Sequence, residues 1–68
     1  MVKPIPVTAA KQIAVEYDYD QVIIIARKIG IDGIEHVTTY GTDEKHCKVA
    51  GDIGNYLKYK VMNWTPPV

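Results

Sequence analysis

The chain has little of what usually stabilises so short a sequence. It has one cysteine, Cys47, in 68 residues, so no disulfide can form within the chain. One cysteine and two histidines are too few for the usual tetrahedral zinc sets, and we expect no metal site and no other cofactor. A domain of this length buries only roughly 60% of the surface of its unfolded chain. Such a chain needs oligomerisation or very good packing to be stable.

Excess charge and long apolar runs are also missing. Eight basic and eight acidic residues give a formal net charge of zero. Bulk nucleic-acid binding is therefore not expected, because an excess of Lys and Arg drives it. No apolar run approaches the roughly 20 residues of a membrane span. Residues 1–6 have no long apolar segment after Lys3, so we expect no signal peptide. Together with the single cysteine, these features predict a cytoplasmic protein.

The most informative stretch of the sequence predicts one β-hairpin. Its first strand is expected over residues 21–29, where the run 22–25 is apolar on both faces. Residues 30–33 begin and end with glycine and predict a four-residue turn. The second strand is expected over residues 34–40, and Gly41 ends it.

Helical patterns flank the hairpin. After an extended arm over residues 1–7, Thr8 is expected to cap a helix over residues 9–17. Thr42 is expected to cap a second helix, with Asp43 and Glu44 in its first turn. Its apolar stripe follows three- and four-residue steps through Cys47, Ala50, Ile53, Leu57, Val61 and Trp64. We therefore expect a single domain over residues 8–64 and a tail over residues 65–68.

Two glycines, Gly51 and Gly54, lie inside the second predicted helix. Each costs roughly 1 kcal/mol against alanine in a helix. Such glycines either allow another backbone to approach closely or are a tolerated weakness, and the sequence leaves both interpretations open.

The predicted fold class is α+β, with the order helix-strand-strand-helix. An antiparallel hairpin is expected to be covered on one face by the two helices. A strand that is apolar on both faces needs cover on its other face as well, and an isolated two-stranded sheet is barely stable in water. We therefore expect a homo-oligomer, most simply a two-fold dimer, built through the hairpin with Ile23 and Ile25 in the interface.

One face of the hairpin carries the candidate binding residues. A symmetric four-residue turn places Arg27 opposite His36, Ile25 opposite Thr38 and Ile23 opposite Tyr40, all on one face. As a ligand site, this face offers an arginine fork for a phosphate, two hydrogen-bonding groups in His36 and Thr38, and an aromatic ring in Tyr40 that can stack on a base. As a dimer interface, the same residues form a polar rim, because Tyr and Arg are enriched at interfaces.

Other reactive residue types form weaker patterns. His46 and Cys47 near a helix N-terminus suggest a reactive thiol, but Cys47 also begins the apolar stripe, which favours a buried structural thiol. Lys58 and Lys60, interleaved with Tyr56 and Tyr59, can form a nucleotide-binding surface or an ordinary solvated helix face. The sequence contains no Ser-His-Asp order of known type, no phosphate-binding loop and no paired-carboxylate pattern. We expect no enzymatic activity and assign no catalytic residue.

The chain from Ala10 to Trp64 resembles a group of short phage and prophage accessory proteins. The resemblance rests on residues 19–27, on the more specific stretch 35–41 that reads Glu-His-Val-Thr-Thr-Tyr-Gly, and on scattered positions of the second helix. It implies a phage product that counters host defence, and it carries over no catalytic residue. Its expected action is to sequester an anionic nucleotide signal, cyclic or otherwise, as a homo-oligomer in the host cytoplasm. The alternative is to block a host defence protein such as a CRISPR effector.

Overall fold

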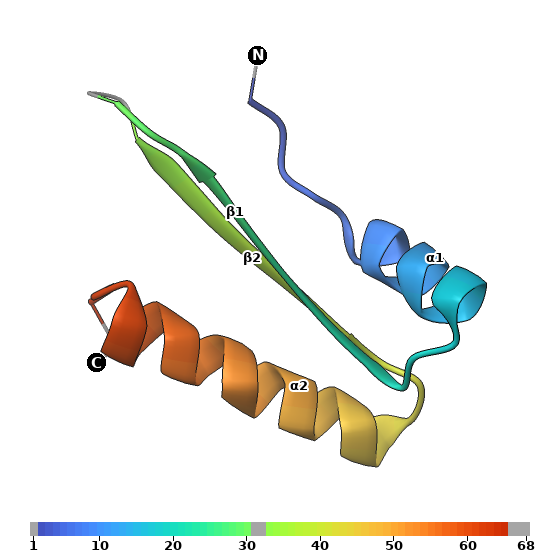
Figure 1. Ribbon diagram of the computed structural model, residues 1–68. Helices are drawn as coiled ribbons and strands as arrows, with labels where there is room; N and C mark the ends of the chain where they lie inside the picture. The colour runs from blue at the N-terminus through green and yellow to red at the C-terminus, as the bar shows by residue number, and fades with distance from the viewer. Residues whose placement is uncertain (1, 31–32, 66–68) are drawn as a thin grey trace.

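The computed structural model describes residues 2–30 and 33–65 (Figure 1). Helix α1 (Val7–Tyr17) is followed by strands β1 (Gln21–Lys28) and β2 (Ile34–Gly41) and by helix α2 (Glu44–Tyr56). A short π-helical segment, η1 (Leu57–Val61), continues α2. The strands pair antiparallel as a hairpin. The predicted α+β class and the order of helix, strand, strand and helix are confirmed.

Neither helix has the N-cap residue that the sequence predicted. Helix α1 starts at Val7, one residue before Thr8, because Pro6 stands at the N-cap in an extended conformation with φ −74° and ψ 157°. Helix α2 is capped by Asp43, whose carboxylate accepts a hydrogen bond of 2.8 Å from the backbone N–H of His46. Thr42 is not the cap, since its N–H donates to the carbonyl oxygen of Asp20 at 3.0 Å and prolongs the hairpin.

The second helix ends before Trp64. Asn63 has φ 61°, a left-handed conformation that asparagine tolerates better than most residues. The chain then folds back, and the N–H of Trp64 donates to the carbonyl oxygen of Lys58 at 2.8 Å. The predicted apolar stripe therefore stops at Val61, and Trp64 lies beyond the helix, turned back toward the hairpin.

The register of the hairpin is shifted by one residue from the prediction. Five residues, 29–33, connect the strands instead of four, because Ile29 has left β1. Arg27 consequently lies opposite Glu35, and His36 lies opposite Ala26. The turn is closed by the N–H of Gly33, which donates to the carbonyl oxygen of Gly30 at 3.1 Å. Residues 31 and 32 of the predicted turn lie outside the described residues.

The two helices cover opposite faces of the hairpin (Figure 1). Gly54 of α2 packs against Thr39 and Val37. Thr38, whose side chain points to the other face, contacts Ile5 in the arm that leads into α1. The prediction that both helices lie on one face is therefore wrong. A hairpin that is apolar on both faces is better covered by one helix on each face, and the structure adopts this arrangement.

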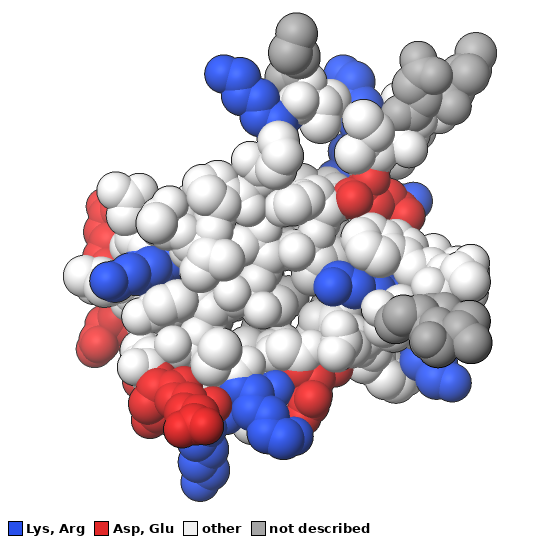
Figure 2. Space-filling model, turned by 180° about the vertical axis from the view of Figure 1, so that it is seen from behind, with Lys and Arg blue, Asp and Glu red and all other residues white. Residues whose placement is uncertain are grey.

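The buried centre of the molecule consists of small side chains. Ala10 and Ala14 of α1 and Ala50 of α2 are its buried apolar residues, and among the described residues no large side chain is fully buried. The accessible surface is 5476 Å², whereas a compact protein of 7.6 kDa exposes about 4,300 Å². Seen from behind (Figure 2), most of the charged side chains lie around the margin of a broad uncharged surface. The chain therefore leaves much uncharged surface uncovered.

The surroundings of Gly51 and Gly54 decide between close packing and tolerated weakness, the two interpretations that the sequence left open. A Cβ atom on Gly54 would lie 2.8 Å from the methyl carbon of Thr39, so this glycine lets α2 approach β2 closely. A Cβ atom on Gly51 would meet nothing within 4 Å. Gly54 is thus required by packing, and Gly51 is a tolerated weakness of the helix.

Candidate functional site

The four residues predicted to share a binding face are not brought together. Arg27 lies on the α2 face of the hairpin, while His36, Thr38 and Tyr40 lie on the α1 face. The predicted shared face is wrong because a one-residue change of register moves every side chain of one strand to the other face relative to its partners. Ile23 and Ile25, the predicted interface residues, lie on the α2 face with Arg27.

His36 and Thr38 anchor the N-terminal arm. The hydroxyl of Thr38 donates to the carbonyl oxygen of Ile5 at 2.7 Å, and His36 Nε2 donates to the same oxygen at 3.1 Å. Thr38 is only 4% exposed. The polar atoms that the sequence assigned to a ligand therefore hold a backbone carbonyl of the same chain, while a ligand role for His36, Thr38 or Tyr40 stays a prediction.

The Thr38 hydroxyl should be necessary for anchoring the arm. We expect Thr38→Val to lower the free energy of unfolding by about 1 kcal/mol, because the half-buried carbonyl of Ile5 loses its shorter hydrogen bond. Thr38→Ser is the matched control, since it keeps the hydroxyl. Urea unfolding gives the stabilities, and the carbonyl carbon-13 shift of Ile5 reports the anchor. An unchanged Ile5 shift in Thr38→Val would show that His36 alone holds the arm.

A different set of side chains meets near the turn end of the hairpin. Glu35 accepts hydrogen bonds from Arg27 Nε at 2.8 Å and from Trp64 Nε1 at 2.9 Å, one on each carboxylate oxygen. The Lys58 ammonium lies 5.5 Å from the centre of the Trp64 ring, within cation–π range. We call Arg27, Glu35, Lys58 and Trp64 the Glu35 cluster. One carboxylate thus orients a guanidinium and an indole at once.

The fold builds this cluster from three separate segments. Arg27 and Glu35 are direct cross-strand neighbours at the end of the ladder, where an opposite-charge pair is favourable. Trp64 reaches them because Asn63 turns the chain back at the end of η1. The sequence prediction missed Glu35 and placed Trp64 in a helix. The signal for the pair is an Arg and a Glu at equal distances from the two ends of the loop, once Ile29 is counted in the loop.

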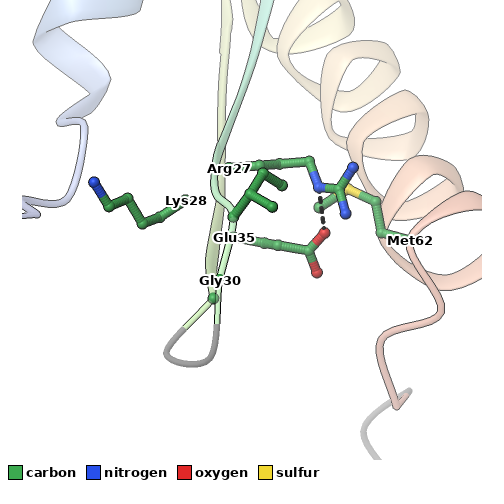
Figure 3. A pocket seen from close by; sticks show the side chains of 7 residues that line it. Arg27, Lys28, Gly30, Glu35 and Met62 are labelled. Atoms are coloured by element: carbon green, nitrogen blue, oxygen red, sulfur yellow. Dashed lines mark hydrogen bonds and ion pairs between the residues drawn. The ribbon is translucent and has the colours of Figure 1, made fainter.

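A shallow hollow of about 350 Å³ opens beside the cluster. Arg27, Glu35 and Met62 line it together with Gly30 at the turn end of the hairpin (Figure 3). In Figure 3 the guanidinium of Arg27 points toward Met62, and the side chain of Lys28 leaves the hairpin in the opposite direction. Within the cluster, the two cations Arg27 and Lys58 outnumber the single carboxylate, which favours an anionic ligand.

His46 and Cys47 lie at the start of α2, next to the first residue of β1. His46 Nδ1 accepts a hydrogen bond of 2.9 Å from the side-chain amide of Gln21. Cys47 is exposed, so the prediction of a buried thiol is wrong. Over residues 2–30 and 33–65, no group of three or more His, Cys, Asp or Glu side chains is placed to hold a metal ion.

An exposed ion pair lies on α2. The exposed Lys48 pairs with Asp52 at 2.9 Å, and this hydrogen bond, followed by the charge of Asp52, raises the pKa of Lys48. Tyr56 is exposed and Tyr59 is half-buried, so the predicted lysine–tyrosine surface is only partly available.

Comparisons with protein-family models, with curated proteins and with solved structures find no match to this chain. The resemblance to phage accessory proteins therefore stays a prediction that rests on residues 19–27 and 35–41. None of the described helices has the length and apolar character needed to span a membrane.

Proposed function

We propose that this chain is a non-catalytic binding protein that holds an anionic nucleotide at the Glu35 cluster. The observation that carries the proposal is the double hydrogen bond of Glu35, which orients Arg27 and Trp64 at 2.8 and 2.9 Å. A nucleotide presents a phosphate and a flat base, and the cluster presents a guanidinium and an aromatic ring side by side.

Each side chain has a distinct part in this binding. Glu35 engages Nε of Arg27, which leaves the terminal amino edge of the guanidinium to face a phosphate as a fork. The indole of Trp64 offers a surface on which a base can stack. Lys58 adds a second cation next to the ring. Glu35 uses both carboxylate oxygens for orientation, which supports retention of the ligand without chemical change.

The predicted resemblance to phage accessory proteins supports a biological role for this binding. The resemblance of residues 19–27 and 35–41 to phage accessory proteins supports a role in countering host defence, in the cytoplasm of the infected cell. A protein that retains a nucleotide signal without destroying it lowers the free concentration of that signal in proportion to the number of sites. We therefore propose sequestration as the mode of action.

The proposal is tested by calorimetry of the full chain against a panel of linear and cyclic mono- and dinucleotides. We expect sub-micromolar binding of at least one anionic nucleotide, and its recovery intact by chromatography after the protein is denatured. Chemical turnover of the ligand would contradict a non-catalytic role. Indifference to the whole panel, together with a stable complex with one host protein from infected cells, would instead select the protein-blocking alternative.

Trp64 should contribute through its ring. We expect Trp64→Leu to weaken nucleotide binding by about 1–3 kcal/mol, the usual range for a base stacked on an aromatic side chain. Tyr56→Leu is the matched control, because Tyr56 is an exposed aromatic outside the cluster. Calorimetry of both variants with the same nucleotide measures the difference. Equal affinities for the two variants would remove Trp64 from the site.

A further inference from the structure

Strand β1 has an unpaired outer edge. The N–H of Thr42 donates to the carbonyl oxygen of Asp20, so these two opposite residues form a hydrogen-bonded pair. Hydrogen-bonded and non-hydrogen-bonded pairs alternate along an antiparallel ladder, so the even-numbered residues of β1 are the ones that bond to β2. The odd-numbered residues Ile23 and Ile25 therefore direct their N–H and C=O groups away from β2. In the described part of the chain, no strand pairs with this edge.

An exposed apolar flank of α2 lies beside the same edge. His46, Val49 and Ile53 follow one another at three- and four-residue steps and share one flank of the helix. This flank is on the β1 side, because His46 bonds to Gln21.

The side chains along this edge keep a large part of their surface open. Val49 is 38% exposed, Ile53 40% and Ile25 42%. We call Ile23, Ile25, Val49 and Ile53 the β1 edge surface.

The central part of β1, residues 22–26, carries nothing that protects this edge from pairing, since the charged residues Arg27 and Lys28 lie at the end of the strand. Natural edge strands are usually blunted by charge, proline or a bulge, whereas residues 22–26 read Val-Ile-Ile-Ile-Ala in regular pairing. On β2, by contrast, α2 packs against Val37 and Thr39 and Glu35 holds two partners, so these side chains already have contacts within the chain. An apolar, unprotected edge of this kind is a template for another strand.

The size of the uncovered surface fits a second copy of the chain. The accessible area of 5476 Å² exceeds that of a compact protein of this mass by about 1,200 Å². A standard interface removes about 800 Å² from each partner. A dimer contact of ordinary size therefore brings the chain close to the exposure expected of a stable globular protein.

We propose that two copies pair through β1 in antiparallel orientation, around a two-fold axis at Ile24, to form a continuous four-stranded sheet. Ile23 of one copy then lies opposite Ile25 of the other, and both lie on the α2 face. Arg27 lies opposite Gln21 of the other copy, so the two arginines are kept apart. The two α2 helices share one face of the sheet, and the two Glu35 clusters lie at its opposite ends. This inference does not depend on the proposed function.

The first test is the mass in solution, by light scattering at micromolar concentration. We expect the full chain to show twice its monomer mass of 7.6 kDa. Ile25→Lys should be monomeric, because it places a charge in the middle of the contact. Val15→Lys is the matched control, since Val15 is exposed on α1, and it should stay dimeric. A monomeric wild-type chain, or a dimeric and folded Ile25→Lys, would overturn the proposal.

The second test fixes the register and does not depend on the folding of the lysine variant. In a Cys47→Ser background, Ile24→Cys should form a disulfide-linked dimer under mild oxidation. Residues paired across the axis without hydrogen bonds have Cα atoms about 4.5 Å apart, within the range that disulfides accept. Val15→Cys in the same background should remain unlinked. Equal cross-linking of the two variants would overturn the proposed pairing.

Discussion

Gly41→Ala should unfold the protein or lower its free energy of unfolding by more than about 3 kcal/mol. A Cβ atom on Gly41 would overlap the backbone of His46 and Cys47, in the first turn of α2. Only Thr42 and Asp43 separate β2 from this helix, so the backbone has little length with which to yield. Overpacking against flexible side chains usually costs about 1–3 kcal/mol, and a rigid backbone obstacle costs more.

Gly51→Ala is the matched control for Gly41→Ala. The same methyl group added at Gly51 meets nothing within 4 Å, so we expect it to stabilise α2 by about 0.5–1 kcal/mol through helix propensity alone. Far-UV circular dichroism and urea unfolding of both variants measure the two changes. Wild-type stability in Gly41→Ala would mean that α2 does not approach the end of β2 as closely as described.

Arg27→Ala should abolish most of the nucleotide affinity while leaving the oligomer unchanged. The loss of a charge-assisted hydrogen-bond pair weakens binding by roughly 2–5 kcal/mol when the contact is buried by the ligand. Glu35 adds to the loss, because its carboxylate would then face the phosphate without the guanidinium. Arg27→Lys should restore only part of the affinity, since lysine lacks the planar fork.

Calorimetry and light scattering on the same samples separate binding from assembly. Lys45→Ala is the control, because Lys45 is an exposed cation at the opposite end of α2 and should change the affinity by less than about 0.5 kcal/mol. If Arg27→Ala bound the nucleotide as well as the wild-type chain, the Glu35 cluster would not be the site. The surface around Tyr56, Tyr59 and Lys60 would be the next candidate.

Local patterns in the sequence were sufficient for the elements but not for their register. The apolar run 22–25 and the glycines at 30 and 33 identified the hairpin, and three- and four-residue spacing identified both helices. Whether Ile29 belongs to the strand or to the loop is not encoded in its residue type, because isoleucine suits a strand. That one residue decided whether Arg27 faces His36 or Glu35.

Other parts of the site depend on backbone groups that residue types do not reveal. The carbonyl of Ile5, which accepts from both His36 and Thr38, is an acceptor that any residue would provide. The return of Trp64 depends on a left-handed conformation at Asn63, which is common for asparagine without being required by it. Helical spacing alone therefore wrongly predicted that Trp64 lies in the second helix.

The small residues at the centre of the molecule determine which mutations can be informative. Ala10, Ala14, Ala50 and Gly54 let both helices lie close to the hairpin, so contact comes largely from backbone and methyl groups. Truncation to alanine, the usual way to map a core, removes nothing at these positions. Substitution of these positions by the larger residues serine, valine and leucine would instead measure how much space each helix has against the hairpin. At these positions, only enlarging substitutions can report on the packing.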